Sequence, residues 1–193
     1  MIFCGNLGSI PISSHSRMKI ISIKKHFATY SIYGKRKTTI NAAFASAIAP
    51  TDEYDPTRLR EAVSVLGQNP DEDLECVYCA EKAATWDHIK SRVKDGASSG
   101  AGHRLGNLLP SCRTCNEKKG QKNWREFLDS LPMSPDARRA REERISDFIE
   151  KYAVDEPPSK RTELHEKYDR LRHHIHELMQ QADEVAKQIR ELK

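Results

Sequence analysis

Apolar side chains recur at helical spacing on the N-terminal side of the chain's centre. Residues 39–49 form an alanine-rich run that ends at Pro50, which predicts a short helix. The apolar side of this helix comprises Ile40, Phe44, Ala47 and Ile48. A second helix is predicted from Pro56 to Gly67, because Asp55 can cap it and its apolar residues keep helical spacing. We expect both helices to support a small domain that follows them.

The same spacing predicts two helices after the centre. Asn123 can cap a helix whose apolar side chains cover the back of the central domain: Trp124, Phe127 and Leu128. Ser134 and Pro135 begin the next helix, which runs to about Tyr152. Its arginines lie either along DNA or on an ordinary solvated face, since glutamates stand beside them: Arg138, Arg139, Arg141 and Arg144.

The tail of the chain, residues 162–193, has a different apolar pattern. Its apolar residues are spaced alternately by four and three: Leu164, Tyr168, Leu171, Ile175, Leu178, Ala182, Val185, Ile189 and Leu192. A helix with such a heptad seam leaves an apolar edge in water unless a partner covers it. We therefore expect a homodimer through a C-terminal coiled coil. The alternative is that the helix folds back onto the chain's own helices.

Four cysteines at the centre of the chain form two Cys-x-x-Cys pairs. They are Cys76 with Cys79 and Cys112 with Cys115. A two-residue gap lets both sulfurs of a pair reach one ion, and four thiols complete a closed tetrahedral Zn²⁺ site. Ordinary buried thiols are the alternative. Because 32 residues (80–111) separate the pairs, more than in a simple zinc ribbon, further structure must lie inside the loop that the metal closes.

Polar residues in and after this loop follow a recognisable order. Asp87 and His88 lie in a strand-like run at 84–89, and Asn107 lies in a second run at 106–109. Directly after the last cysteine comes Asn116, followed by the Lys-Lys-Gly of residues 118–120. Over residues 74–131 this order resembles the HNH endonuclease family. The resemblance implies an α+β fold class: a small zinc-stapled ββα-metal domain with flanking helices and a C-terminal coiled-coil helix.

The resemblance also implies a role for each polar residue. His88 is the general base, and Asn107 ties the hairpin loop in place. Asp87 and Asn116 bind the catalytic cation, Mg²⁺ or Mn²⁺, which suits carboxylate and amide oxygens. The third motif position is an asparagine here, in place of the histidine that names the family. The expected contacts to nucleic-acid phosphates are Arg113, Lys118 and Lys119. The implied activity is metal-dependent hydrolysis of DNA phosphodiester bonds.

Part of this chemistry follows from the residues alone. A neutral imidazole, with a pKa near 6.5, can take a proton from water at neutral pH. Neighbouring strand residues point to opposite faces, so His88 can face the water while Asp87 faces the metal. His103, in a glycine-rich loop, fits a solvated histidine better than a phosphate ligand. Two other functions are compatible with the zinc site: a non-catalytic zinc-finger module that binds DNA, and a coiled-coil adaptor for a partner protein.

Composition adds the cellular setting. The 193 residues carry a net charge of +4, which suits a soluble protein that meets nucleic acid. No apolar run reaches the roughly 18 residues of a membrane span. The first 51 residues contain no Asp or Glu, which predicts a basic, disordered arm that tracks the phosphate backbone. The same composition fits an organelle transit peptide. Reduced thiols in a zinc site indicate a reducing compartment, the cytoplasm.

The predicted organisation therefore has five parts along the chain. These are the basic arm at 1–37, the supporting helices at 38–70, the HNH domain at 71–131, a helical extension at 132–156, and a linker with the coiled-coil helix at 157–193. Small metal-stapled cores bury little apolar surface, so the flanking helices are expected to add to the stability of the central domain.

Overall fold

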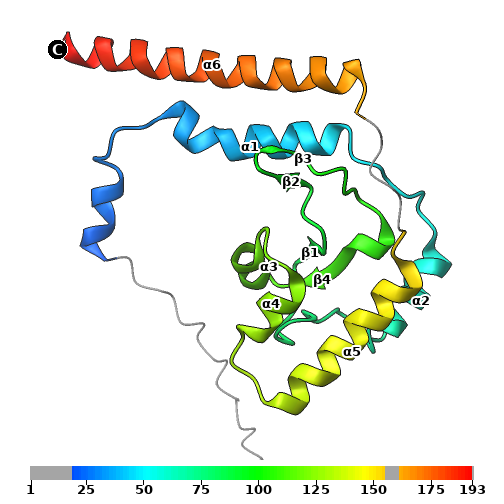
Figure 1. Cartoon of the computed structure of the whole chain (residues 1–193). Helices are drawn as coiled ribbons and strands as arrows, with labels where there is room; N and C mark the ends of the chain where they lie inside the picture. Colours follow the sequence, from blue (N-terminus) through cyan, green and yellow to red (C-terminus); the bar gives the residue numbers. More distant parts are fainter. Residues whose placement is uncertain (1–18, 155–160, 193) are drawn as a thin grey trace, which may run out of the picture. The chain divides into compact units, whose positions relative to one another are not determined.

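The computed structural model describes residues 19–154 and 161–192. Residues 1–18 of the predicted basic arm and the predicted linker prolines at 157–158 lie outside these ranges. Within them, helices combine with two small antiparallel sheets, as Figure 1 shows. The α+β class predicted from the sequence is therefore confirmed.

The chain divides into two compact units, Met1–Ser31 and Ile32–Lys193. In the first unit, the described residues include a 3-10 helix, η1 (Ile20–Lys25), which buries none of its side chains. The other described helices and strands belong to the second unit. The fold of that second unit positions the candidate site.

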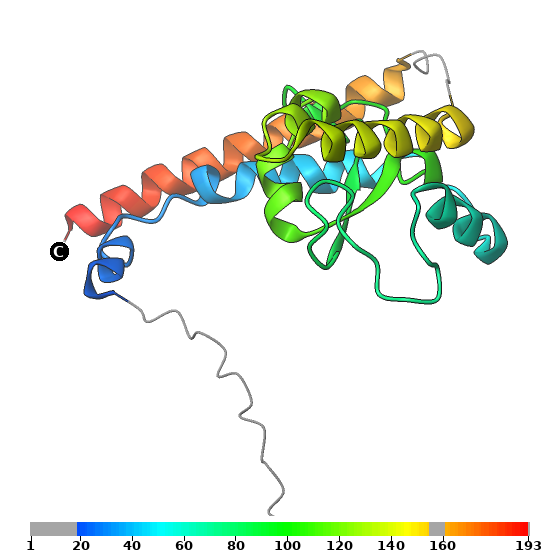
Figure 2. The ribbon, with the colours of Figure 1, turned by 90° about the horizontal axis from the view of Figure 1, so that it is seen from below.

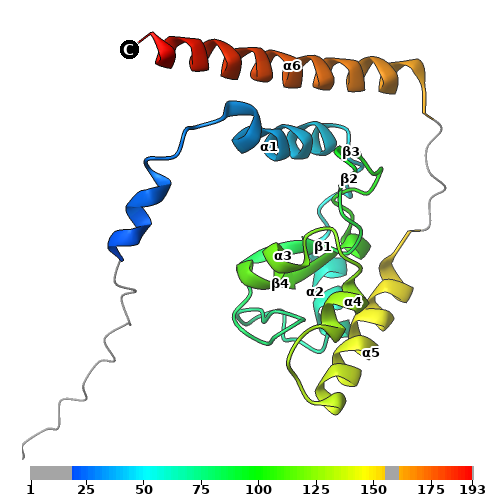
Figure 3. The same cartoon turned by 60° about the vertical axis from the view of Figure 1, so that its left-hand side comes forward.

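The central sheet pairs β1 (Thr85–His88) with β4 (Leu108–Ser111) in antiparallel orientation. A short 3-10 helix, η2 (Leu105–Asn107), leads into β4. Helix α3 (Arg113–Lys119) follows directly and contacts β1, which Figure 3 shows. Two strands followed by a helix are the ββα arrangement that the resemblance implied.

Three helices surround this centre, and each begins at a cap that the sequence predicts. α2 (Pro56–Val65) is capped by Asp55, α4 (Trp124–Asp129) by Asn123, and α5 (Pro135–Tyr152) by Ser134, each through a side-chain oxygen that accepts a backbone N–H. Their apolar faces join one core with residues of the segment that carries the cysteine pairs, including Leu66, Tyr78, Leu109, Trp124, Phe127, Ile145 and Phe148. This shared core is the packing expected if the helix predicted from Pro56 to Gly67 supports the central domain.

Most arginine side chains on one face of α5 contact other parts of the protein. Arg141 donates to the carbonyl of Val77 at 3.3 Å, and Arg138 donates to the carbonyl of Leu131 at 3.0 Å. Arg144 lies against Gly67. Three of the four guanidinium groups that the sequence offered as a DNA-facing row therefore contact the protein itself.

Helix α1 (Ile32–Ala47) begins earlier than the predicted start at residue 39, so it includes the end of the predicted arm. Its buried position is Ala45, whereas Ala47 and Ile48, expected on the apolar side, are exposed. The difference arises because α1 contacts two elements that lie far away in the sequence. One is a small hairpin of β2 (Val93–Lys94) and β3 (Ala97–Ser98), and the other is the C-terminal helix.

The C-terminal helix α6 (Glu163–Glu191) runs beside α1, as Figures 1 and 2 show. The carboxylate of Asp183 accepts the backbone N–H groups of Ile32 at 2.6 Å and Tyr33 at 3.0 Å, so α6 caps the first turn of α1. The buried Arg172 donates to the side-chain oxygen of Asn41 at 3.0 Å. This packing is the fold-back arrangement that the sequence left as the alternative to a coiled coil.

Only part of the heptad seam faces α1. The Tyr168 ring packs on Phe44, with 4.9 Å between ring centroids, and its hydroxyl donates to the Phe44 carbonyl. The other half of the seam, which we call the exposed heptad row, consists of Leu164, Leu171, Leu178, Val185 and Leu192. Each of these side chains is at least 50% exposed. The row repeats every seven residues and has no partner among the described residues.

Candidate active site

The four cysteines of the two pairs meet at one point. Their sulfur atoms all lie within 4.8 Å of one another, and those of Cys79 and Cys112 are 3.7 Å apart. Zinc–sulfur bonds of about 2.3 Å in a tetrahedron require sulfur–sulfur distances of about 3.8 Å. Cys112 is also the N-cap of α3, where its sulfur accepts the backbone N–H of Cys115 at 3.3 Å. The cluster therefore fits a structural zinc ion.

The metal-binding turn is joined directly to the central sheet. The backbone N–H of Val77, between the first two cysteines, donates to the carbonyl of Pro110 in β4 at 3.1 Å. The second pair begins immediately after β4 and continues into α3. A metal bound by the four sulfurs would clamp the β1–β4 sheet to α3, so the positions of the polar residues on both elements depend on it.

Asp87 points into the core, and its side chain is held there by two donors. The Tyr78 hydroxyl donates to the carboxylate at 2.8 Å, and the ammonium of Lys119 lies 3.2 Å away. Lys119 also donates to the backbone carbonyl of His88 at 2.7 Å. Burial raises the pKa of the Asp87 carboxyl, while Lys119 and Tyr78 oppose this shift. Asp87 is only 2% exposed, which accounts for the effect of burial.

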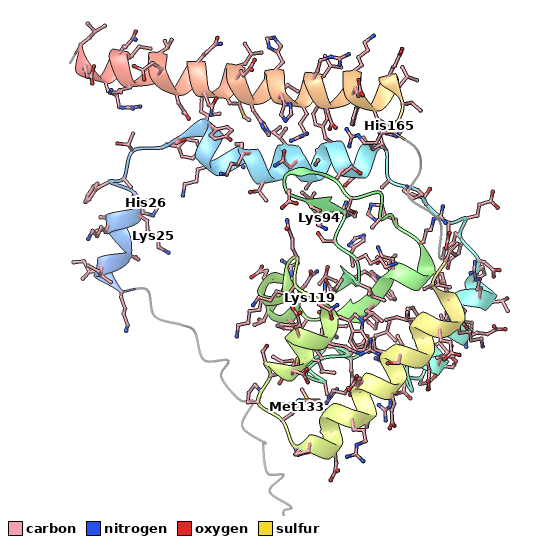
Figure 4. All side chains as sticks on the ribbon, in the orientation of Figure 1. Lys25, His26, Lys94, Lys119, Met133 and His165 are labelled. Atoms are coloured by element: carbon pink, nitrogen blue, oxygen red, sulfur yellow. The ribbon has the colours of Figure 1, made fainter. Side chains whose placement is uncertain are left out.

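Lys119 was expected from the sequence to contact a nucleic-acid phosphate, and the structure corrects this. The residue is 1% exposed, and its ammonium turns toward β1 from the last turn of α3, where Figure 4 labels it. An ion pair with a buried carboxylate is the reason, because a lone charge at Asp87 would be costly in the core. Its neighbours Lys118 and Arg113 are exposed on the same helix and stay available to phosphates.

Asn116 lies one turn earlier on α3. Its side-chain N–H donates to the hydroxyl of Thr85 at 3.2 Å. Thr85 and Asp87 lie two positions apart on β1 and so share one strand face, toward α3. Over residues 19–154 and 161–192, the amide oxygen of Asn116 has no hydrogen-bond partner and is not among the buried unpartnered atoms, so it reaches solvent. It is a free oxygen donor of the kind that hard cations prefer.

His88 occupies the opposite face of β1. Its Nε2 atom lies 3.2 Å from Nδ1 of His103, with the rings edge to face. Burial lowers the pKa of His88 to about 4, with further lowering by Arg92, His103 and Lys119. The imidazole is therefore neutral at physiological pH. This is the protonation state that a general base requires.

Asn107 joins the two ends of the long loop between β1 and β4. Its side-chain oxygen accepts the N–H of Lys90 at 2.7 Å, and its side-chain nitrogen donates to the carbonyls of Lys90 at 3.1 Å and Gly102 at 2.9 Å. Three hydrogen bonds from one amide hold the loop across the end of β1. These bonds fit the positional task predicted for Asn107.

The residues predicted as the site are gathered in one small region, but they do not all contact each other. Asp87 faces Tyr78 and Lys119, His88 faces His103, and Asn116 faces Thr85. Among the described residues, no hydrogen bond or ion pair joins any two of these three side chains. The sequence expected them to converge on one cation, so the shared cation site stays a prediction.

The residue that sequence analysis missed is His103. It was expected to be a solvated loop histidine, whereas the structure places its ring against His88. The sequence shows only that a glycine, Gly102, precedes it. The structure explains this glycine, because a Cβ at Gly102 would lie 1.9 Å from the carbonyl oxygen of Pro50. Such a contact between segments far apart in the chain has no periodicity that a sequence pattern could reveal.

Comparison with known proteins agrees with this geometry. The region that contains the cysteine cluster, the β1–β4 sheet and α3, residues 76–122, matches the family model described as HNH endonuclease. The match covers about a quarter of the chain and confirms the resemblance inferred from the residues. Searches of curated proteins and of solved structures found no match. None of the helices in the described ranges has the length and apolar character needed to cross a bilayer.

Proposed function

We propose that the protein is a metal-dependent endonuclease that hydrolyses DNA phosphodiester bonds. The observation that carries the proposal is the neutral His88 imidazole on a sheet joined to a four-cysteine cluster, within a region that matches the HNH endonuclease family. Hydrolysis of a phosphodiester needs a nucleophile and a way to stabilise charge on the phosphate. The candidate residues supply groups for both tasks.

In this proposal His88 takes a proton from the attacking water. Within the described part of the chain, its Nδ1 atom has no hydrogen-bond partner and is not among the buried unpartnered atoms, so this nitrogen can meet water. Asp87 and Asn116 would hold a divalent cation, Mg²⁺ or Mn²⁺, which would stabilise charge on the phosphate and the leaving oxygen. The Asp87 carboxylate retains lone pairs beyond those used by Tyr78 and Lys119. Lys118 and Arg113 contact phosphates from the exposed side of α3.

The direct test is incubation of supercoiled plasmid with the zinc-loaded protein. We expect nicking when Mg²⁺ or Mn²⁺ is added and none when a chelator removes the added cation while zinc stays bound. Zinc content measured on the same sample separates loss of the catalytic cation from loss of the structural one. Nicking that is equal with and without added cation would contradict the proposal.

One observation favours a second candidate, a non-catalytic zinc-finger module that binds DNA. In such a module the polar residues only hydrogen-bond within the fold, and Asp87 and Asn116 both do so here. A gel-shift assay beside the plasmid assay discriminates the two functions. Binding of DNA without cleavage under any divalent cation would favour the zinc-finger module.

The low pKa of His88 predicts an unusual acid limb in the pH profile. With a pKa of about 4, His88 stays neutral well below the ordinary histidine value near 6.5. We therefore expect the single-turnover nicking rate to stay level as pH falls from 7 to about 5.5, where an unperturbed base would lose about tenfold. Between about pH 6.5 and pH 4, His88 takes up a proton more readily in the unfolded chain than in the folded protein. The free energy of unfolding therefore decreases as pH is lowered through this window. An acid midpoint near 6.5 would contradict this assignment.

The C-terminal helix adds a proposal on assembly. We infer that the exposed heptad row of α6 pairs with the same row of a second copy, because the row places an apolar side chain in solvent once in every heptad of the described helix. Two active sites held together in this way could cut both strands of a duplex. The charged and polar residues beside the row are compatible with solvent at the edges of such a seam.

The oligomeric state tests this pairing. Wild type should have twice the monomer mass by light scattering at micromolar concentration, and the double variant Leu171→Lys, Leu178→Lys should be monomeric with unchanged helicity. Gln180→Lys, at an exposed position outside the row, is the matched control and should stay dimeric. A monomeric wild type that still cuts both strands would refute the link between pairing and double-strand cleavage.

A further inference from the structure

We propose that His103 is a positioning residue that fixes the imidazole of His88. The inference rests on the proposed function, in which His88 accepts a proton from water. It concerns a residue outside the His88, Asn107 and Asn116 set, in a loop that sequence patterns describe only as glycine-rich. The contact that motivates it is the 3.2 Å distance from Nδ1 of His103 to Nε2 of His88.

The backbone of His103 is fixed by a segment far away in the chain. Its N–H donates to the carbonyl of Pro50 at 2.9 Å, and its carbonyl accepts the N–H of Asp52 at 3.4 Å. Thr51 and His103 form an isolated parallel bridge at this point. The Asp52 carboxylate accepts the N–H of Leu105 at 2.9 Å, which braces the loop two residues further on. A residue held this firmly can orient its neighbour.

Two neighbouring features make that position possible. Gly102 is buried, and any side chain there would collide with the Pro50 carbonyl, since its Cβ would lie 1.9 Å from the oxygen. The side chain of Asn107 donates to the Gly102 carbonyl at 2.9 Å. Asn107 therefore also holds the backbone of the residue that precedes His103.

The contact with His103 selects which nitrogen of His88 can react. Nε2 is engaged, so Nδ1 is left for water, and the ring cannot rotate without losing its partner. In the base form, the proton of His88 is on Nε2 and is donated to Nδ1 of His103. When Nδ1 takes the proton of the attacking water, the imidazolium that forms keeps the same hydrogen bond. The hydrogen bond to His103 thus both orients the His88 ring and stabilises its positive charge after proton transfer.

Arg92 contacts His103 from the same loop. Its guanidinium lies 3.3 Å from Nε2 of His103 and also hydrogen-bonds the hydroxyl of Ser46 in α1. A guanidinium can only donate, whereas the base form of His88 requires a proton on Nε2 of His103. The proposed base form is therefore reached only when Arg92 no longer donates to Nε2 of His103. A DNA phosphate is the anion that would draw the guanidinium away.

Kinetics of His103 variants test the positioning role. For His103→Ala we expect kcat for plasmid nicking to fall about 10- to 100-fold, as when an outer partner of a site residue is removed, with KM, zinc content and melting temperature unchanged. His103→Asn should recover much of the rate, since its amide can place an acceptor near the former Nδ1. Lys94→Ala, at an exposed position of the β2–β3 hairpin, is the matched control and should behave as wild type.

Failure of the inference and failure of the proposed function give different results. If His103→Ala keeps the wild-type kcat while His88→Ala is inactive, His103 has no positioning role. The same holds if His103→Asn is as slow as His103→Ala, or if the alanine variant loses zinc or melting temperature together with activity. If the wild-type protein does not cleave, or His88→Ala cleaves equally, the proposed function itself fails.

Discussion

Replacing His88 with alanine should lower the single-turnover rate of plasmid nicking about 100- to 10,000-fold, the range expected for loss of a general base. The physical reason is that His88 presents a neutral imidazole whose free Nδ1 reaches solvent. The fold should persist, because the side chain is only partly buried and its ring partner His103 can meet water in its place. Nicking rates, zinc content and thermal melting should be measured on one preparation.

His174→Ala provides the control for this substitution. His174 is an exposed histidine on α6, far along the chain from the candidate site, so its removal should leave the rate unchanged. Equal nicking by wild type, His88→Ala and His174→Ala would show that any cleavage comes from another group or from a contaminating nuclease. Loss of activity in His88→Ala together with loss of zinc would indicate a folding defect in place of a catalytic one.

Replacing Cys112 with serine is expected to release the zinc ion and unfold the central domain. Structural zinc contributes about 10–16 kcal/mol of apparent binding free energy, which is comparable to the roughly 5–15 kcal/mol of total stability of an ordinary domain. Cys112 holds two positions at once, as a member of the cluster and as the N-cap of α3. Metal analysis, circular dichroism and the fluorescence of the buried Trp124 measure the outcome.

Cys4→Ser is the matched control, because it changes the cysteine that belongs to neither Cys-x-x-Cys pair of the sequence. It should keep one zinc per chain and the wild-type melting temperature. Cys112→Ser that folds with wild-type melting and without zinc would contradict the metal-dependent fold. In that case the four thiols would be an ordinary part of the core.

Features set by local chemistry could be predicted from the sequence. The caps Asp55, Asn123 and Ser134 each begin the helix expected of them, because a side-chain oxygen can satisfy the first free N–H groups without help from distant residues. The cysteine pairs meet because the spacing of their thiols fits one metal. The order of strand, strand and helix was implied by the resemblance.

Features set by contacts across the chain could not be predicted in the same way. Lys119 turns inward because Asp87 is buried opposite it, and neither residue carries a pattern that reveals the other. His103 meets His88 only because residues 50–52 hold the intervening loop. Along α6, the heptad repeat predicts an apolar stripe, but it does not predict which part of that stripe α1 covers.

A Mn²⁺ titration of the zinc-loaded protein, followed by electron paramagnetic resonance, tests most directly whether a second, exchangeable cation binds beside His88. Lys119 lies at the Asp87 carboxylate in the structure, so binding requires the cation to share that carboxylate or to displace the ammonium. We predict one bound Mn²⁺ per chain in wild type and weakened binding in Asn116→Ala, with the zinc content of both unchanged. A fully zinc-loaded, folded protein that binds no Mn²⁺, with or without DNA, would contradict the metal-dependent hydrolysis proposed for this site.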